Sequence, residues 1–164
     1  NNILDYSKLE AGVTGVEKSE FDVCALVTDL FASFKIRNTK NIESRIIKNN
    51  ESIIVYSDKT KINNILNYLL NNAFKFTDKG YIEIEIREEE EEILFSVEDS
   101  GKGISPVERE KIFERFYKID EHSQGSGLGL PIAQKLVKLL GGDLNIKSEL
   151  GKGTKFSFSI KKRL

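Results

Sequence analysis

A two-residue alternation of apolar and polar side chains constrains the fold of this chain most. From Tyr81 to Arg87 every second residue is isoleucine, and residues 93–97 repeat the alternation with Ile93, Phe95 and Val97. Successive side chains of a strand point to opposite faces, so each segment predicts a strand with one buried face. The glutamate run 88–92 between them is more typical of a solvated hairpin tip than of a cation site. The sequence therefore predicts a hairpin in a sheet with one buried face.

The most regular helical pattern follows Asp58, which is placed as its N-cap. Apolar residues recur three and four positions apart and predict one buried face: Ile62, Ile65, Leu66, Leu69, Leu70 and Ala73. Tyr68, Asn72 and Lys75 are spaced four and three residues apart, so they share another face. Polar residues beside a buried stripe are candidates for lining a pocket.

A second helix is predicted from its cap Asp22 to Arg37, with an inward face made of Ala25, Leu26, Leu30 and Phe34. Short strands are predicted at 42–47 and 52–56. A third helix, 128–140, has Pro131 in its first turn and glycines after its end. Strands at 144–147 and 154–161 close the chain, the latter with Phe156, Phe158 and Ile160 facing inward. This order predicts an α/β fold, a two-layer sandwich whose mixed, mostly antiparallel sheet is covered on one face by three helices.

The first residues read differently from the rest. Residues 1–12 resemble the end of a helix that stops at Gly12, and 13–20 resemble a linker, so we expect a domain over 21–164. Twelve residues are too few for a stable isolated helix. Together with the absence of a starting methionine, this predicts a fragment of a longer protein.

Composition excludes several classes of function. The 25 basic and 26 acidic side chains give a net charge of -1, so no basic field favours nucleic acid. Cys24 is the only cysteine, which excludes an internal disulfide and any zinc site with several cysteines. No run of about 18 apolar residues is present to span a membrane.

Four motifs in a fixed order carry the candidate chemistry: 72–75, 99–103, 125–130 and 151–154, the last a tight turn. Asp99 ends a strand and is followed by Gly101 and Gly103, which let backbone approach a ligand closely; an ordinary turn is the alternative. Gly125, Gly127 and Gly129 precede a helix, where backbone amides favour phosphate, or else form a merely flexible loop. The pattern is neither the dinucleotide fingerprint nor a P-loop.

On the predicted helix after Asp58, Asn72 offers a neutral oxygen to Mg²⁺, which takes few protein ligands. Lys75 lies one turn further on and could reach a phosphate as a point charge. Asn72 and Lys75 are therefore the candidate catalytic residues, and Asn72 is the candidate metal ligand.

Taken together, these motifs resemble the catalytic ATP-binding domain of sensor histidine kinases, in the superfamily shared with gyrase, Hsp90 and MutL. The resemblance covers about Phe21 to Leu164 and implies the Bergerat ATP-binding fold. The N box is Asn72-Ala-Phe-Lys75-Phe76-Thr77, and the glycine boxes are 99–103, 125–130 and 151–156. The F box is 113–116, and residues 2–12 resemble the end of the dimerisation helix.

The resemblance implies roles for individual residues. Asp99 would bind the adenine amine, Phe76 would flank the base, Asn72 would hold Mg²⁺ and Lys75 would contact phosphate. Residues from about 104 to 126 would form a lid over ATP. The remaining implied ATP-binding residues are Gly101, Gly103, Ile104, Phe113, Arg115, Phe116, Gly125, Gly127, Leu128, Gly129 and Thr154, with Phe113 and Phe116 packing the lid down.

The resemblance also implies partners. The γ-phosphoryl of ATP would pass to a histidine on the kinase's own dimerisation domain and then to a response regulator receiver domain, within a homodimeric, cytoplasmic kinase whose membrane anchoring the sequence leaves open. His122, the only histidine, lies in the lid without the surroundings of an acceptor. The acceptor is therefore expected outside this chain.

Two departures keep alternatives open. Tyr68 stands where the family usually has a second asparagine, and the lid segment Glu121-His-Ser-Gln124 is short and lacks arginine. Phosphate charge would then fall to Lys75 and Arg115, or to a partner. The alternatives are an ATPase or serine kinase of the same superfamily, and a docking module that has lost nucleotide binding.

Overall fold

The predicted hairpin forms the centre of the sheet. A computed structural model describes residues 2–122 and 125–164. In it β4 (Gly80–Glu88) and β5 (Glu92–Asp99) pair antiparallel, with Ile84 opposite Val97. Their inward isoleucines, phenylalanine and valine are at most 1% exposed. Burial of each such side chain contributes about 1.5–3 kcal/mol, which fixes the strand register.

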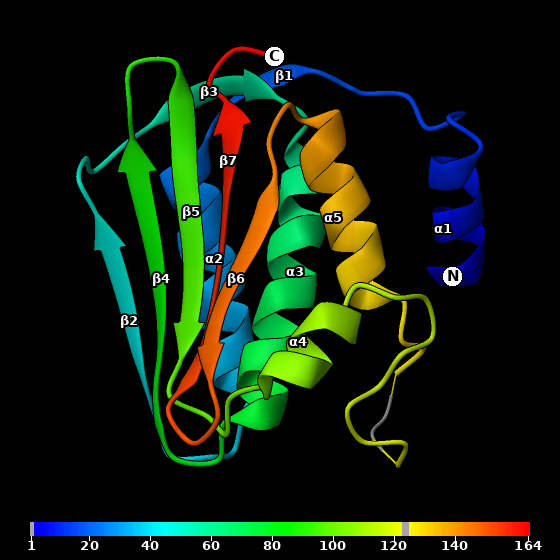
Figure 1. Cartoon of the computed structure of the whole chain (residues 1–164). Coiled ribbons are helices and arrows are strands. Elements are labelled where there is room, and N and C mark those ends of the chain that lie inside the picture. The colour runs from blue at the N-terminus through cyan, green and yellow to red at the C-terminus, as the bar shows by residue number, and fades with distance from the viewer. Residues whose placement is uncertain (1, 123–124) are drawn as a thin grey trace.

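Three further strands complete a five-stranded sheet in the order β2-β4-β5-β7-β6 (Figure 1). Only β2 (Ile42–Lys48) runs parallel to its neighbour, whereas β6 (Leu144–Glu149) and β7 (Gly153–Lys161) pair antiparallel. Phe95 and Phe158 stack at 4.9 Å between ring centroids. The predicted mixed, mostly antiparallel sheet is confirmed.

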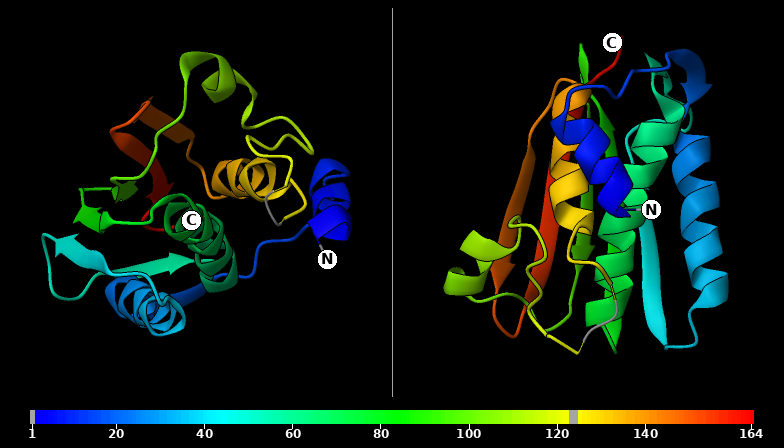
Figure 2. Two further views of the ribbon diagram at one scale, coloured as in Figure 1. Left: turned by 90° about the horizontal axis from the view of Figure 1, so that it is seen from below. Right: turned by 90° about the vertical axis from the view of Figure 1, so that its right-hand side faces the viewer.

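Helices α2 (Val23–Arg37), α3 (Lys59–Phe76) and α5 (Gly129–Leu139) cover one face of this sheet (Figures 1 and 2). The Asp58 side chain caps α3 by accepting a hydrogen bond from the Lys61 amide at 3.0 Å. All six apolar residues predicted for the α3 stripe are at most 2% exposed. The two-layer sandwich is confirmed, and α3 forms its centre.

The inward face of α2 differs from the prediction. Asp22 caps the helix as expected, but the buried residues are Val23, Cys24, Val27, Phe31 and Phe34. Ala25 is exposed, and Leu26 and Leu30 are only partly buried against the core. Apolar residues occupy both sides of this helix, so periodicity alone does not determine which side meets the sheet.

A small second sheet was not predicted. β1 (Ser19–Asp22) pairs antiparallel with β3 (Ile54–Ser57), so part of the expected linker is a strand and the expected strand 52–56 lies outside the main sheet. The C-terminal residues join its edge, because the Leu164 amide donates to the Tyr56 carbonyl at 2.9 Å. Pairing partners this distant in sequence leave no local signal.

Two short helices flank the body. α1 (Asn2–Glu10) packs against α5 and contains no fully buried residue, and the turn after it contains Gly12, whose φ is +69°. α4 (Pro106–Lys111) starts in a capping box between Ser105 and Glu108, which the sequence analysis did not identify. None of the helices in the described part of the chain is long and apolar enough to cross a bilayer.

Candidate functional site

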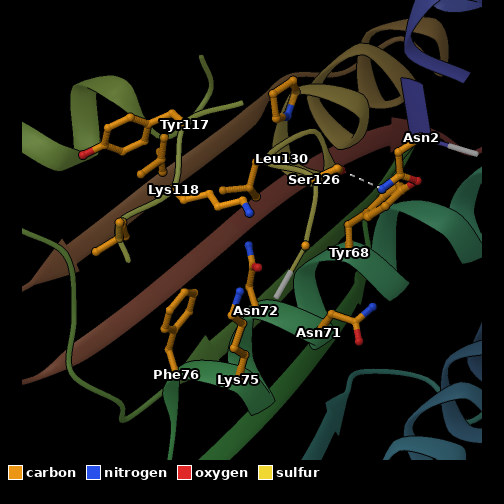
Figure 3. Close-up of a pocket in the computed structure, with 16 residues that line it drawn as sticks. Asn2, Tyr68, Asn71, Asn72, Lys75, Phe76, Tyr117, Lys118, Ser126 and Leu130 are labelled. Atoms are coloured by element: carbon orange, nitrogen blue, oxygen red, sulfur yellow. Dashed lines mark hydrogen bonds between the residues drawn. The ribbon is translucent and has the colours of Figure 1, made fainter. Parts of the chain in front are cut away.

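Adjoining hollows lie between α3 and the chain that leads from the end of β5 to α5. A deep cavity of about 30 Å³ continues into an outer cavity of about 360 Å³, drawn in Figure 3. Both are lined by Asn72, Phe76, Ile112, Ile119 and Leu130. A third, open hollow of about 510 Å³ adjoins them at Lys75 and Phe76. Together they form one site with a closed end and an open end.

Asp99 lies at the closed end. It is the last residue of β5, is 7% exposed, and its Oδ1 accepts a hydrogen bond from the Gly101 amide at 2.9 Å. Burial raises the pKa of this carboxyl above its ordinary value, although the amides of Gly101 and Thr154 act in the opposite direction. A buried acceptor of this kind suits a ligand that brings its own hydrogen-bond donor.

The glycines after Asp99 allow close backbone contacts. A Cβ on Gly101 would lie 2.4 Å from the Phe76 carbonyl oxygen and 2.9 Å from Asp99 Oδ1. A Cβ on Gly103 would lie 2.1 Å from the Glu149 carbonyl oxygen, and its φ is +71°. These two positions therefore require glycine for steric reasons, and Gly103 also for its backbone conformation.

The wall of the deep cavity is mostly apolar. Phe76 and Ile104 belong to it as expected, and Thr154 is buried there with its hydroxyl 2.9 Å from Ser148 Oγ. Four apolar residues of this wall were not predicted as ligand contacts: Ile112, Ile119, Leu130 and Phe156. They come from α5, β7 and the chain before α5, and only the tertiary fold brings them together.

The polar face of α3 lines the outer cavity. Asn72 and Lys75 lie there with Tyr68, and Asn72 points across the cavity toward Lys118 (Figure 3). Burial lowers the pKa of Lys75, and the neighbouring charges of Lys118 and Lys102 lower it further. The negative charge of Asp120 raises it and only partly offsets these effects. Lys75, Lys118 and Lys102 all line the hollows at the open end, which suits an anionic group. Lys118 and Lys102 had not been identified from sequence.

The glycine loop closes the other side of the outer cavity. Gly125, Gly127 and Gly129 line it, and Gly125 and Gly127 have φ of +129° and +71°. Leu128 is 1% exposed at the N-cap of α5, and its amide donates to Ser126 Oγ at 3.3 Å. The loop thus borders the cavity at a helix N-terminus, as predicted for a phosphate site.

Leu128, an expected ligand contact, is buried at the N-cap of α5 and lines none of the hollows. Three further expected ligand contacts, Phe113, Arg115 and Phe116, lie elsewhere. Phe113 is half-buried against the core, whereas the Phe116 side chain is 60% exposed and does not pack against the core in this structure. The Phe116 backbone has φ +62° and its amide donates to the Gly127 carbonyl at 3.0 Å, which turns the ring outward. Arg115 pairs with Glu10 of α1 at 3.6 Å. None of the three lines the described hollows.

The predicted lid, residues 104–126, is only partly described. His122 is exposed, and its amide donates to the Asp120 carboxylate at 3.0 Å. Ser123 and Gln124 of the predicted lid lie outside the described residues. Within the described ranges, no cluster of three or more histidine, cysteine, aspartate or glutamate side chains is placed to hold a metal ion.

Known proteins with similar sequences are sensor kinases. Hybrid signal transduction histidine kinase B of Dictyostelium discoideum is 39% identical over 175 residues, which cover 98% of this chain and 9% of that protein. Autoinducer 2 sensor kinase/phosphatase LuxQ of Vibrio cholerae is 38% identical over 170 residues, covering 98% of this chain and 20% of that protein. The chain thus corresponds to a small part of these relatives.

Solved structures are similar over the same range. Full-length ShkA in complex with AMPPNP has a TM-score of 0.89 and 29% identity, covering 98% of this chain and 34% of that one. The catalytic domain of histidine kinase ThkA has a TM-score of 0.79 and 32% identity, covering 90% of this chain and 97% of that one.

Residues 57–164 match the family model described as histidine kinase-, DNA gyrase B-, and HSP90-like ATPase. This range contains α3, Asp99 and the glycine loop, the elements that enclose the hollows. The chain therefore belongs to the histidine kinase-, gyrase B- and HSP90-like ATPase family, and its similarity to sensor histidine kinases extends over nearly its whole length.

Proposed function

We propose that this domain binds ATP with Mg²⁺ and transfers the γ-phosphoryl group to a histidine on the dimerisation domain of its kinase. The observation that carries the proposal is one continuous site with a buried carboxylate, Asp99, at its closed end and Asn72, Lys75 and the glycine loop at its open end. The base of a nucleotide suits the closed end, and its phosphates suit the open end.

The closed end fits adenine. Asp99 offers an acceptor for the exocyclic amine, and the apolar side chains of Ile104, Ile112 and Phe156 offer a dry wall for the ring. A Cβ on Gly101 would reach to 2.9 Å from Asp99 Oδ1, so any other residue there would crowd this acceptor. Phe76 borders both cavities and would flank the base.

The open end fits a magnesium-bound triphosphate. Mg²⁺ typically takes one or two protein ligands and completes its shell with phosphate oxygens and water, so a single amide oxygen from Asn72 is sufficient. Lys75 and Lys118 would neutralise phosphate charge, and the amides of the glycine loop would add hydrogen bonds. Arg115 pairs with Glu10, so we assign to Lys118 the phosphate-neutralising role that was expected of Arg115.

When bound, ATP supplies the phosphoryl group. In the transfer the bond from the γ-phosphorus to the bridging oxygen breaks, a bond to the acceptor imidazole nitrogen forms, and ADP leaves with the electron pair. The protein contributes positioning and charge neutralisation, the main contributions of proteins to this chemistry. We infer that the acceptor lies outside this chain, because exposed His122 sits on the lid.

We also propose roles for the other segments of the chain and for its partner. Residues 1–12 would end the dimerisation helix, 13–20 would link it to the catalytic domain 21–164, and the product would pass to a receiver domain of a response regulator. The 90% coverage by an isolated catalytic domain and 98% by a full-length kinase support this division. Because ATP is a cytoplasmic metabolite, we place the domain in the cytoplasm.

Titration with a fluorescent ATP analogue, with and without Mg²⁺, tests the binding proposal. Loss of a charge-assisted hydrogen bond in Asp99→Asn should weaken affinity by about 10- to 100-fold. Asp29→Asn, on the exposed side of α2, is the matched control and should bind like the parent. Equal affinities for Asp99→Asn and the parent would contradict the role of Asp99, and no binding by the parent would favour a docking module.

Labelled ATP tests the transfer. With the dimerisation helices of the kinase supplied in trans, the label should appear on them and be lost in acid, as phosphohistidine is. Acid-stable label would indicate a hydroxyl acceptor and a serine kinase instead. Phosphate released without any labelled protein would indicate an ATPase.

A further inference from the structure

A short chain of hydrogen bonds connects α1 to the glycine loop. The Tyr68 hydroxyl donates to Asn2 Oδ1 at 3.2 Å, and Asn2 Nδ2 donates to Ser126 Oγ at 3.1 Å (Figure 3). Ser126 Oγ also accepts from the Leu128 amide at 3.3 Å. The chain therefore links α3, α1 and the N-cap of α5 at the outer cavity, which Asn2 and Tyr68 both line.

Tyr68 is held firmly at the α3 end of this chain. Its ring packs on Gly129, where an added Cβ would lie 3.1 Å from Tyr68 Cδ1. Burial raises the pKa of the Tyr68 hydroxyl, and the negative charge of Asp5 raises it further, so the hydroxyl stays protonated and donates. The ring is thus a fixed support from which the hydroxyl reaches α1.

α1 makes both apolar and polar contacts with the domain, and Tyr6 and Leu9 pack partly against the core. The Tyr6 ring lies 5.6 Å from the Arg115 guanidinium carbon and 5.2 Å from Lys135 Nζ, and Glu10 pairs with Arg115 at 3.6 Å. No α1 residue is fully buried. Exposed pairs of this kind contribute about 0–1 kcal/mol each. Because α1 contains no fully buried residue, we expect the loss of these hydrogen bonds to shift its docking measurably.

We propose that Tyr68 is a positioning residue that ties the glycine loop to α1 through Asn2 and Ser126, so that nucleotide binding and α1 docking stabilise each other. The inference rests on the proposed function, since it assigns the outer cavity to phosphates. Ordering a loop with glycines at positions 125 and 127 costs conformational entropy, and docked α1 lowers that cost before the ligand arrives. The coupling is reciprocal by thermodynamic linkage.

Tyr68→Phe tests the coupling, because it removes the hydroxyl and keeps the ring against Gly129. Loss of one neutral hydrogen bond should weaken binding of the ATP analogue with Mg²⁺ by about 2- to 10-fold. Tyr81→Phe is the matched control: its hydroxyl donates to Glu98 at 2.7 Å, a pair that lines none of the three hollows, and its affinity should be unchanged.

Two further measurements separate positioning from direct ligand contact. Asn2→Ala should weaken nucleotide binding to a similar degree. The double variant Tyr68→Phe/Asn2→Ala should bind no more weakly than either single variant, because both substitutions break the same series of hydrogen bonds. Bound nucleotide should slow hydrogen exchange of the α1 amides from Ser7 to Glu10 in the parent and much less in Tyr68→Phe.

The outcomes are distinct. Additive effects of the two substitutions, unchanged or tighter binding by Tyr68→Phe, or equal slowing of α1 exchange in both proteins would overturn the coupling while leaving the proposed function intact. Failure of the parent to bind the ATP analogue would instead overturn the proposed function, and the inference with it.

Discussion

Asp99 shows at the scale of one residue how a binding site weakens the fold that contains it. Its carboxyl is 7% exposed and accepts a hydrogen bond from the Gly101 amide, yet burial raises its pKa. The charged form is therefore less favourable in the unliganded folded protein than in the unfolded chain. A ligand donor at this position would relieve that penalty.

The raised pKa of Asp99 predicts that the stability of the unliganded domain depends on pH. With a raised folded-state pKa, the folded protein binds this proton more tightly than the unfolded chain, so the contribution of Asp99 to stability falls as pH rises from the ordinary carboxyl pKa through the raised one. Asp99→Asn should lack this fall and have a higher Tm than the parent at neutral pH without ligand. Thermal scans over a pH series check this; a neutral-pH Tm below that of the parent would contradict it.

Gly101 allows a steric prediction. A Cβ there would lie 2.4 Å from the Phe76 carbonyl oxygen, which belongs to backbone that cannot rotate away. Gly101→Ala should destabilise the domain by about 1–3 kcal/mol and weaken binding of the ATP analogue, because the strand end beside Asp99 must shift. Gly15→Ala is the control, since nothing lies within 4 Å of its added Cβ. Urea unfolding of the two variants measures the difference, and equal midpoints would refute the steric argument.

At the scale of elements, Asp58 connects the start of α3 to the segment before β1. It caps α3 through the Lys61 amide, pairs with Lys61 Nζ at 2.8 Å, and accepts a hydrogen bond from the Glu17 amide at 2.9 Å. Burial opposes its ionisation, but these hydrogen bonds outweigh burial and lower its pKa. One carboxylate therefore fixes both the start of α3 and the path of the chain at Glu17.

Asp58→Ala should destabilise the domain by roughly 2–4 kcal/mol, combining a lost cap with donors left unpaired. Asp58→Asn keeps an acceptor oxygen and should cost less. The lowered folded-state pKa means that the stabilisation by Asp58 is complete above the ordinary carboxyl pKa and is lost as pH falls through the lowered value. Asp58→Asn should lack that acid-side loss in urea unfolding, and an identical acid-side profile would contradict the assignment.

At the scale of the whole molecule, the domain has one core, and α1 lies beside it. Leu69 of α3 is 0% exposed between the sheet and the neighbouring helices, whereas Leu9 of α1 only packs partly against the core. Figures 1 and 2 show α1 next to α5 and away from the sheet. The two leucines therefore report on global and local stability separately.

Leu69→Ala should lower the free energy of unfolding by about 2–5 kcal/mol, the usual cost of a large cavity in a core. Leu9→Ala should change it by less than about 1 kcal/mol, because α1 can undock without unfolding the sheet. Denaturant unfolding of both variants makes the comparison. A loss for Leu9→Ala as large as that for Leu69→Ala would show that α1 belongs to the cooperative core.

The sequence by itself determined the sheet, the α3 stripe, the caps Asp22 and Asp58, and the positions of Asp99, Asn72, Lys75 and the glycine loop. Each of these features follows from a local pattern. Strand alternation, helical periodicity and glycine spacing all depend on residues that are close together in the sequence. The same locality explains the helix end before Gly12.

Only the tertiary structure decided which side of α2 is buried, the pairing of β1 with β3, the outward turn of Phe116 and the pairing of Arg115 with Glu10. It also decided that Lys118, Ile112 and Asn2 line the cavities. Each depends on which distant segments meet, and contacts between distant segments are set by packing of the whole core rather than by any local pattern.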